Sequence, residues 1–257
     1  MKVLSIIPAR MGSSRFPGKP LADILGKTMI EHCFQRANTA ARVHLTYVAT
    51  CDQEIFDCVE DFGGNVVMTS VLHDRATTRS AEALDIIEEK YGHQFDIIVM
   101  VQGDEPLISP DAISQTVQHF EDDEVDIVNI MSPIFSKTQF VDKNNVKVVC
   151  DALSNAMYFS REPIPHNWVG DEVVTPFMQT GIIAFRRQAL IRFNSMKESH
   201  LERLESVDMN RVLEAGMKIR MVASDTATLG VDIPAELEQA RDMMLTDTFF
   251  NSYRDSN

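Results

Sequence analysis

The chain has 257 residues, of which 44% are hydrophobic and 24% charged, a composition typical of globular proteins. Its net charge of −14 argues against general nucleic-acid binding, which depends on neutralising phosphates. The four cysteines show no C-x-x-C spacing, so neither a zinc site nor a disulfide framework is predicted.

No apolar run approaches the roughly 18 residues that span a bilayer, and the first residues lack the pattern of a signal peptide. We therefore expect a cytoplasmic protein without a membrane partner. At this length the chain can build a sizeable core, and no clear linker divides it, so we predict a single domain over residues 1–257.

The first predicted element is a buried strand over residues 3–8, followed by the loop PARMGSSRFPGKPL. In this loop five residues separate Gly12 from Gly18, and Pro20 replaces the hydroxyl that a Walker loop requires. The dinucleotide-binding pattern G-x-G-x-x-G is absent as well. Residues 1–22 contain four basic and no acidic residues, which leaves 20 basic residues against all 38 acidic ones elsewhere. This composition predicts an anion-binding loop, suited to a polyphosphate.

Helices and strands alternate after this loop, according to the spacing of apolar residues. The predicted elements are a helix over 29–41, a strand over 44–50, a helix over 53–62, a strand over 66–69, a helix around 83–91 and a strand over 97–101. Such alternation predicts a mostly parallel sheet flanked by helices, with ligands bound at the carboxyl ends of the strands. The basic loop and the segment QGDEPLI, residues 102–108, both follow strands and are expected to face one site.

The second half of the chain is less regular. We predict strands over 126–132, 146–150, 181–186 and 219–223, an irregular crossing at YFSREPIP, and helices over 201–215 and 234–244. Residues 133–180 have weak periodicity and are interpreted as an inserted flap or subunit contact. The polar residues 246–257 are expected to fray.

Two aspartates are candidates for metal binding. Asp104 follows a buried strand and Gly103, and Asp232 precedes the helix that begins at Pro234. Asp232 alone could be a helix N-cap, because Asp commonly stands just before a helix with Pro in its first turn. A polyphosphate site needs a metal near its basic loop, and one carboxylate holds magnesium poorly, so the pair is the more informative feature.

These segments together resemble the cytidylyltransferase family that couples 3-deoxy-manno-octulosonate (Kdo) to CMP. The resemblance covers nearly the whole chain and is carried by IIPARMGSSRFPGKPLADILGKTMIEH, VQGDEP, NNVKVV, YFSREPIP and GVDIPAELEQA. It implies an α/β nucleotide-diphospho-sugar transferase fold of the glycosyltransferase-A type, a Mg²⁺-dependent reaction of CTP with a sugar acid, and a homodimer. A surface glycan such as lipopolysaccharide is the family's usual destination.

The resemblance also implies roles for individual residues. Arg10, Ser13, Arg15 and Lys19 would form the triphosphate cradle, and Asp104 and Asp232 would hold Mg²⁺. Gln102 would orient the sugar, although a strand-end hydrogen bond is its alternative role. The expected catalytic residues are Arg10, Lys19 and Gln102, and the expected nucleotide-binding residues are Ala9, Arg10, Ser13, Arg15, Lys19, Thr77 and Arg79.

The chain departs from the family pattern in two places. The family's His-x-Ser-Gly-Thr-x-Arg loop reads HDRATTR here, which keeps His73, Thr77 and Arg79 but introduces Arg75 and Ala76. An added cation and a lost glycine would change the shape of this loop. We still expect CTP rather than UTP to be the nucleotide.

The second departure concerns positions that contact the sugar in the family. MQTGIIAFR places Gln179 and Ile183 where the family has His and Tyr, and SVDMNR places Asp208 and Met209 where it has Glu and Gln. A pocket that hydrogen-bonds a particular hydroxyl discriminates strongly, so this change predicts an altered 2-keto sugar acid: deoxygenated, amino-substituted or acylated. Arg161 is a candidate partner for the sugar carboxylate, with a surface salt bridge as its alternative.

Two other functions stay open at this point. A transferase acting on a sugar phosphate or polyol phosphate would need cations facing the acceptor, and Arg75, Arg161 and Lys147 are the candidates. A catalytically silent nucleotide-binding module is the other alternative, against which the intact Arg10, Lys19, Asp104 and Asp232 argue.

Overall fold

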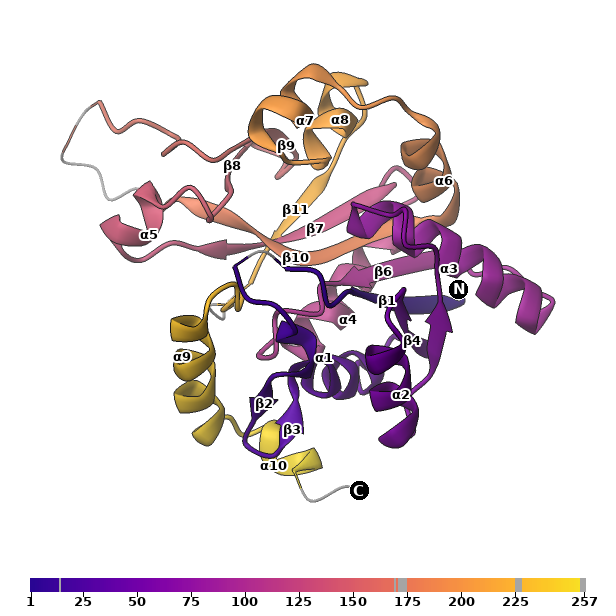
Figure 1. Cartoon of the computed structure of the whole chain (residues 1–257). Helices are drawn as coiled ribbons and strands as arrows, with labels where there is room; N and C mark the ends of the chain where they lie inside the picture. Colours follow the sequence, from indigo (N-terminus) through magenta and orange to yellow (C-terminus); the bar gives the residue numbers. More distant parts are fainter. Residues whose placement is uncertain (14, 169, 171–174, 225–227, 255–257) are drawn as a thin grey trace.

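A mixed β-sheet forms the centre of the molecule in the computed structural model, which describes residues 1–13, 15–168, 170, 175–224 and 228–254. The strand order along its main path is β11-β7-β10-β6-β1-β4-β5 (Figure 1). These strands are β1 (Val3–Ala9), β4 (Leu45–Thr50), β5 (Val66–Met68), β6 (Ile97–Val101), β7 (Ile127–Pro133), β10 (Phe177–Arg186) and β11 (Arg220–Ala223).

Strand directions explain where the site lies. β5, β4, β1 and β6 are mutually parallel, β10 runs antiparallel to both β6 and β7, and β11 is parallel to β7. The predicted mostly parallel sheet with flanking helices is confirmed. Because β1 and β6 are parallel neighbours, with Ile6 opposite Met100, the loops that follow them leave the sheet at the same edge.

Helices cover both faces of the sheet (Figure 1). Residues on β1 alternate between two cores: Leu4 and Ile6 belong to one, and Val3 and Ile7 to the other. The first core also contains side chains of α3 (Ala76–Tyr91), α6 (Arg187–Ser195) and α8 (Met209–Glu214). The second contains side chains of α1 (Met29–Asn38), α2 (Gln53–Asp61) and α4 (Pro110–Gln118).

The C-terminal region packs on the N-terminal half through a third apolar cluster. It includes α9 (Pro234–Leu245) and α10 (Phe250–Tyr253), beside the short pair β2 (Asp23–Ile24) and β3 (Lys27–Thr28). Phe250 and Tyr253 are buried, so the expected fraying of 246–257 is wrong as far as α10, because these aromatic side chains anchor it. Residues 255–257 lie outside the described part of the chain.

The segment 133–180 extends the sheet and does not form a detached loop. It contains α5 (Lys137–Val141), β8 (Lys147–Cys150) and β9 (Ala156–Ser160), and β8 pairs with β10 as well as β9. The irregular crossing predicted from YFSREPIP is therefore wrong for its first residues, which continue β9. Residues 169 and 171–174 lie outside the description, and a role of the segment in subunit contact stays a prediction.

The helix predicted over 201–215 is broken in the middle. α7 (His200–Glu205) ends at Ser206, whose backbone is left-handed with φ of 52°, and α8 begins at Met209. The break turns the chain so that Val207 and Asp208 line a cavity. The short 3₁₀ helices are η1 (Lys19–Leu21) and η2 (His119–Glu121).

No helix of the described residues is both long enough and apolar enough to cross a membrane.

Candidate active site

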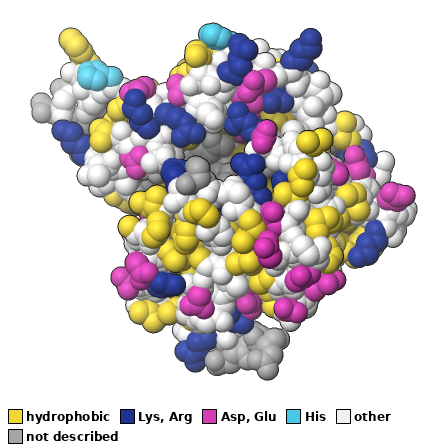
Figure 2. All heavy atoms as spheres, in the orientation of Figure 1, with side chains coloured by type: hydrophobic (Ala, Val, Ile, Leu, Met, Phe, Trp, Pro, Cys, Tyr) yellow, Lys and Arg dark blue, Asp and Glu magenta, His cyan; other side chains and the backbone are white. Residues whose placement is uncertain are grey.

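A cavity of about 910 Å³ opens at the sheet edge where β1 and β6 end. Its walls come from the basic loop, the segment after β6, the segment 133–180 and the approach to α9. Lys and Arg side chains gather around a hollow on this face of the molecule (Figure 2). The structure thus brings the basic loop and the QGDEPLI segment to one site, as their positions in the sequence predicted.

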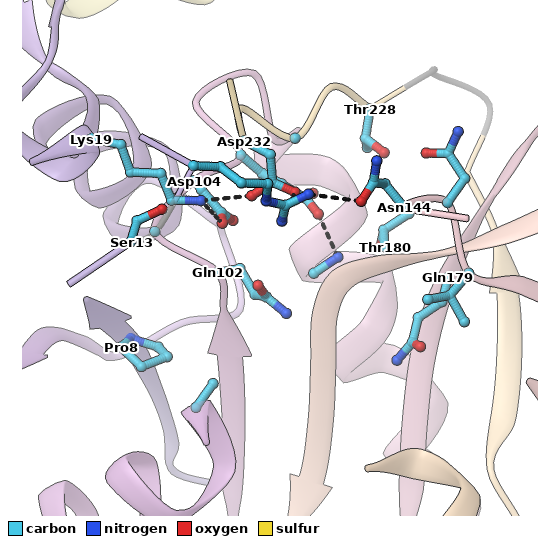
Figure 3. Close-up of a pocket in the computed structure, with 18 of the residues that line it drawn as sticks. Pro8, Ser13, Lys19, Gln102, Asp104, Asn144, Gln179, Thr180, Thr228 and Asp232 are labelled. Carbon is cyan, nitrogen blue, oxygen red and sulfur yellow. Dashed lines mark hydrogen bonds and ion pairs between the residues drawn. The ribbon is translucent and has the colours of Figure 1, made fainter. Parts of the chain in front are cut away.

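Lys19 lies at the centre of the polar network in the cavity (Figure 3). Its Nζ donates hydrogen bonds to Asp104 Oδ2 at 2.6 Å, to Asp232 Oδ1 at 3.0 Å and to the Val231 carbonyl at 3.1 Å. Burial would lower the pKa of Lys19, but the two carboxylates outweigh it and hold this pKa above its usual value. Lys19 is therefore a charged ammonium that bridges both aspartates.

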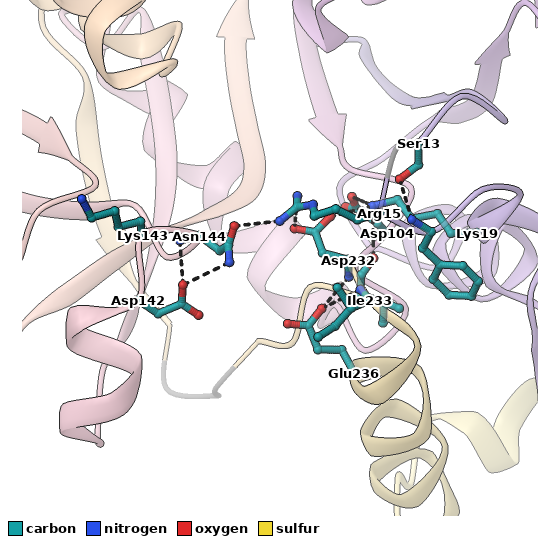
Figure 4. Close-up of polar contacts among 12 residues, drawn as sticks. Ser13, Arg15, Lys19, Asp104, Asp142, Lys143, Asn144, Asp232, Ile233 and Glu236 are labelled. Atoms are coloured by element: carbon teal, nitrogen blue, oxygen red, sulfur yellow. Dashed lines mark hydrogen bonds and ion pairs between the residues drawn. The ribbon is translucent and has the colours of Figure 1, made fainter.

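The two aspartates are brought together by the backbone. The Val231 N–H donates to the Asp104 carbonyl at 2.8 Å, which joins the loop after β6 to the approach of α9. Glu236 accepts hydrogen bonds from the N–H groups of Asp232 and Ile233 at 2.6 and 3.0 Å (Figure 4). Ile233 occupies the N-cap position of α9. The Asp232 carboxylate therefore does not cap this helix and faces the cavity.

Arg15 connects two walls of the cavity (Figure 4). One guanidinium nitrogen donates to Asp232 Oδ2 at 2.8 Å and the other to Asn144 Oδ1 at 2.7 Å. Asn144 is itself held by Asp142, which accepts from its backbone and side-chain N–H groups at 2.9 and 3.1 Å. Sequence reasoning missed Asn144, because nothing in its local pattern links it to the basic loop.

The remaining residues of the basic loop line the same cavity. Ala9, Arg10 and Ser13 all contribute to its wall. Arg10 is half-exposed, and its only ion pair in the described structure is a 3.6 Å contact with the exposed Asp74. This guanidinium is thus held loosely and is accessible to an anion.

The donor set fits a magnesium ion bound together with a triphosphate. Mg²⁺ is usually held by one or two carboxylates, water and substrate phosphates, and not by an all-protein cage. Asp104 and Asp232 supply two carboxylates that already share one cation, Lys19. Among the described residues no cluster of three or more His, Cys, Asp or Glu side chains forms a complete metal cage.

Gln102 and Gln179 face the cavity from neighbouring strands (Figure 3). The Gln102 N–H donates to the Gly181 carbonyl at 3.0 Å, and the Gly181 N–H donates to Glu105 at 2.6 Å. A β-carbon on Gly181 would lie only 2.8 Å from the side chain of Gln102, so glycine permits this close approach. Burial and the nearby Asp104 raise the pKa of Glu105 to about 7.

The HDRATTR segment lines the cavity with His73, Asp74, Arg75, Ala76 and Arg79, whereas Thr77 lies behind the wall. Arg79 is buried and donates to Thr69 Oγ1 at 2.6 Å and to the His73 carbonyl at 3.2 Å. Thr77 is buried too, and its hydroxyl donates to Asp208 at 3.1 Å. The two residues predicted to bind nucleotide thus hold the loop and Asp208 in place, and direct contact with a nucleotide stays a prediction.

Lys147 and Arg161, two of the cations considered for an acceptor phosphate, donate hydrogen bonds to backbone carbonyls. Lys147 is fully buried and donates to the carbonyls of Asp142, Asn145 and Arg161 at 2.9, 2.7 and 2.5 Å. Arg161 in turn donates to the carbonyls of Lys143, Glu205 and Ser206. These contacts leave Arg161 at most two of its five N–H groups for a ligand.

The predicted sugar-binding positions divide into two groups. Gln179, Ile183 and Asp208 line the cavity, together with Arg161. Met209 is fully buried at the start of α8 and belongs to the first core, so the structure does not bring it to the cavity wall. Burial raises the pKa of Asp208, because ionisation is disfavoured away from water.

Comparisons with known proteins agree with this geometry. The sequence matches the family described as Cytidylyltransferase over residues 4–219. It is 43% identical over 246 residues to the 3-deoxy-manno-octulosonate cytidylyltransferase of Syntrophotalea carbinolica, covering 92% of this chain and 96% of that protein. The enzyme of the same name from Syntrophus aciditrophicus is 39% identical, with 95% and 98% covered.

Solved structures give the same result. A CMP:2-keto-3-deoxy-manno-octonic acid synthetase complexed with CTP superposes with a TM-score of 0.87 at 37% identity, covering 95% of this chain and 99% of that one. A cytidylyltransferase from Leptospira borgpetersenii, at 18% identity and a TM-score of 0.64, shares the fold.

Proposed function

Because the chain belongs to the 3-deoxy-manno-octulosonate cytidylyltransferase family, we propose that it couples CTP to Kdo, or to a modified relative of Kdo, and releases pyrophosphate. The observation that carries this proposal is the shared contact of Asp104 and Asp232 with Lys19, beside a basic loop. Two carboxylates and several cations at one point suit a metal-bound triphosphate.

In the proposed reaction the anomeric hydroxyl oxygen of the sugar acid attacks the α-phosphorus of CTP. The new bond joins this oxygen to phosphorus, the bond from phosphorus to the pyrophosphate oxygen breaks, and the hydroxyl proton is released. Negative charge develops on the phosphoryl oxygens and the leaving group, so catalysis consists chiefly of positioning and electrostatic stabilisation.

The chain's own groups have distinct parts in this scheme. Arg10, Ser13, Arg15 and Lys19 bind the triphosphate, and Gln102 orients the acceptor. Asp104 and Asp232 hold Mg²⁺, which neutralises phosphate charge when it is bound. Lys19 and Arg15, which donate to these two carboxylates, would donate to phosphate oxygens in the complex.

The hydrogen bonds of Lys147 and Arg161 to backbone carbonyls argue against a phosphorylated acceptor. Of the three cations considered for an acceptor phosphate, Arg75 is the loosely held one, 3.5 Å from Glu198. A dianionic phosphate needs more positive charge than this. A silent module is disfavoured, because Lys19, Asp104 and Asp232 are arranged as the reaction requires.

A homodimer and a cytoplasmic location, with a product that feeds a surface glycan, complete the proposal. The exposed side chains of Phe135 and Trp168 in the segment 133–180 are compatible with a subunit contact there, which would remove their apolar surface from water.

The proposal is tested by pyrophosphate release from CTP, Mg²⁺ and Kdo, with each component omitted in turn. Release that requires all three supports it, whereas turnover only with phosphorylated acceptors would favour the alternative. Replacing CTP with UTP tests base selection by the altered HDRATTR segment, and we expect CTP to be preferred.

A further inference from the structure

The acceptor end of the cavity combines an apolar surface with a half-buried carboxylate, Asp208. Resting on the proposed function, we propose that the acceptor is a 2-keto sugar acid in which a deoxy, methyl or acylamino group replaces at least one hydroxyl of Kdo. Met100, Ile183 and Val207 receive this group, and Asp208 accepts a hydrogen bond beside it.

The sheet order places these residues on the acceptor side. The basic loop and the HDRATTR segment follow β1 and β5, on one side of β6. β10 lies on the other side of β6 and carries Ile183, which is directly opposite Met100 on β6. Met100 and Gln102 point to the same face, two residues apart, so Met100 lies roughly 7 Å along the strand from the residue that orients the acceptor.

The three apolar side chains offer an acceptor no hydrogen bond. Met100 and Ile183 are each 2% exposed and Val207 is 5% exposed, although all three line the cavity. Each belongs to the first core, so each is fixed by packing from behind. A hydroxyl placed against this surface would lose its water without gaining a protein partner, which is unfavourable. A carbon-bound hydrogen, a methyl group or an acyl carbon chain has no hydrogen bond with water to lose on binding there.

Asp208 supplies the polar contact at the edge of this surface. It follows Val207, and among the contacts of the described residues its carboxylate accepts one hydrogen bond, from the Thr77 hydroxyl at 3.1 Å. A carboxylate has about four acceptor sites, so at least two remain for a hydroxyl or an N–H group of the ligand. An acylamino substituent would satisfy both features, because its N–H donates to Asp208 and its acyl carbon chain lies against the apolar surface.

The charge distribution favours a neutral substituent. Lys147 and Arg161 are committed to backbone carbonyls, and Arg211 is paired with Glu202. Arg75, whose charge acts on Asp208, already contacts Glu198 at 3.5 Å. A phosphorylated or carboxylated substituent would therefore be repelled by the Asp208 carboxylate, with Arg75 to offset it.

Single-site analogues of Kdo provide the test. Wild-type enzyme with CTP and Mg²⁺ is given Kdo and analogues in which the hydroxyl at C4, C5, C7 or C8 is replaced by hydrogen or by an acetamido group. We expect kcat/KM for at least one analogue to exceed that for Kdo about 10-fold or more. A kcat/KM for Kdo that equals or exceeds every analogue would overturn the inference.

Two neighbouring isoleucines give a matched pair of variants. Ile183→Thr adds a hydroxyl to the apolar surface and should move the analogue-to-Kdo ratio toward Kdo by about 10-fold. Ile182→Thr makes the same change on the opposite face of β10, in the second core, and should leave the ratio unchanged. The ratio is independent of the folded fraction, so destabilisation does not affect it. Equal shifts in both variants would overturn the assignment of Ile183.

Equilibrium binding separates this inference from the proposed function. The same acceptors are titrated calorimetrically into enzyme saturated with Mg²⁺ and cytidine 5′-(α,β-methylene)triphosphate, which cannot transfer its nucleotide. Absence of pyrophosphate release with every acceptor would overturn the proposed function. The order of the dissociation constants still decides the inference: tighter binding of an analogue supports it, and tighter binding of Kdo contradicts it.

Discussion

Lys19 fixes three oxygen atoms at the centre of the cavity, two from carboxylates and one from a backbone carbonyl. Its ammonium offsets the repulsion between Asp104 and Asp232, which would otherwise be two like charges in a partly buried place. In the proposed reaction these two carboxylates would hold Mg²⁺, and a triphosphate would offer Lys19 new hydrogen-bond partners. Metal and nucleotide binding should therefore favour one another.

Asp104→Asn and Asp232→Asn should each lower kcat for pyrophosphate release by about 100-fold or more, because each would remove one charged ligand of the proposed Mg²⁺ ion. Substitution by Asn preserves shape, so circular dichroism and the melting temperature should change little. Asp242→Asn, an equal change of charge on the exposed side of α9, is the control and should retain normal activity. Near-normal turnover of Asp104→Asn at saturating Mg²⁺ would contradict the metal assignment.

Lys19→Ala should reduce kcat with CTP by about 100-fold and change the dissociation constant for CMP far less, because CMP lacks the β- and γ-phosphates. Steady-state kinetics and calorimetry measure the two effects. Lys27→Ala is a suitable control, since Lys27 also forms a half-buried ion pair, with Glu31 at 2.7 Å, but outside the cavity. Equal losses in catalysis and CMP binding would move Lys19 to the α-phosphate or the sugar.

The sequence predicted which side chains line the site better than it predicted the hydrogen-bond partners of those side chains. Lys19 and Asp104 could be grouped because both follow strands expected to end at one sheet edge, and Asp232 joined them through the need of a polyphosphate site for metal-binding carboxylates and through the family resemblance. The backbone carbonyls that engage Arg79, Lys147 and Arg161 leave no pattern in the sequence. For the same reason, the link from Arg15 to Asn144 could not be anticipated.

Elements position the acceptor side of the cavity through close approach of backbones. β10 lies against the end of β6 at Gly181, where an added β-carbon would be 2.7 Å from Glu105 Oε1 and 2.8 Å from Gln102. Side chains at this distance must move. The geometry of Gln102 therefore depends on a residue that contributes no side chain.

Gly181→Ala should lower kcat/KM by about 10- to 100-fold, because the added β-carbon would displace Gln102, the residue proposed to orient the acceptor. Gly92→Ala serves as the control: its φ of 65° at the end of α3 makes alanine unfavourable by roughly 1 kcal/mol, far from the cavity. Thermal unfolding of both variants shows whether lost stability explains the lost activity. Normal kinetics for Gly181→Ala would show that Gln102 tolerates the shift.

Most element positions could be predicted from the spacing of apolar residues, and the exceptions have local causes. The helix over 201–215 has continuous helical periodicity, but a left-handed backbone at Ser206 breaks it and creates the turn that carries Asp208. The start of YFSREPIP continues β9, because pairing with β8 fixes it in the sheet. Such tertiary contacts override local sequence preference.

At the scale of the whole molecule, the C-terminal helix α10 packs on α1. His32 on α1 is fully buried, with one ring nitrogen 2.8 Å from the Ile24 carbonyl and the other 2.8 Å from the Tyr253 hydroxyl. Burial, reinforced by the nearby Arg36, lowers the pKa of His32 to about 4. The fold thus requires an uncharged imidazole where α1 contacts α10.

This requirement predicts the pH dependence of stability. An ordinary histidine in the unfolded chain has a pKa of about 6.5, so the unfolded state binds more protons between pH 6.5 and 4. The stability that neutral His32 contributes is complete above about pH 6.5 and is lost as the pH falls toward 4, by about 3 kcal/mol in all. Urea unfolding measures it across this range.

His32→Gln should be less stable at neutral pH but should lose less stability on acidification than the wild type. His200→Gln, at an exposed position, should retain the wild-type slope. Parallel pH profiles for wild type and His32→Gln would contradict the assignment of this titration to His32.

The proposed activity of the chain is transfer of a cytidylyl group from CTP to a sugar acid. The most direct measurement is the amount of pyrophosphate and of CMP-sugar, identified by mass spectrometry, formed from CTP, Mg²⁺ and the panel of 2-keto sugar acids. We expect equal amounts of both products, no product without acceptor, and loss of both with Asp104→Asn. Pyrophosphate release without an acceptor, or no CMP-sugar with any acid, would contradict it.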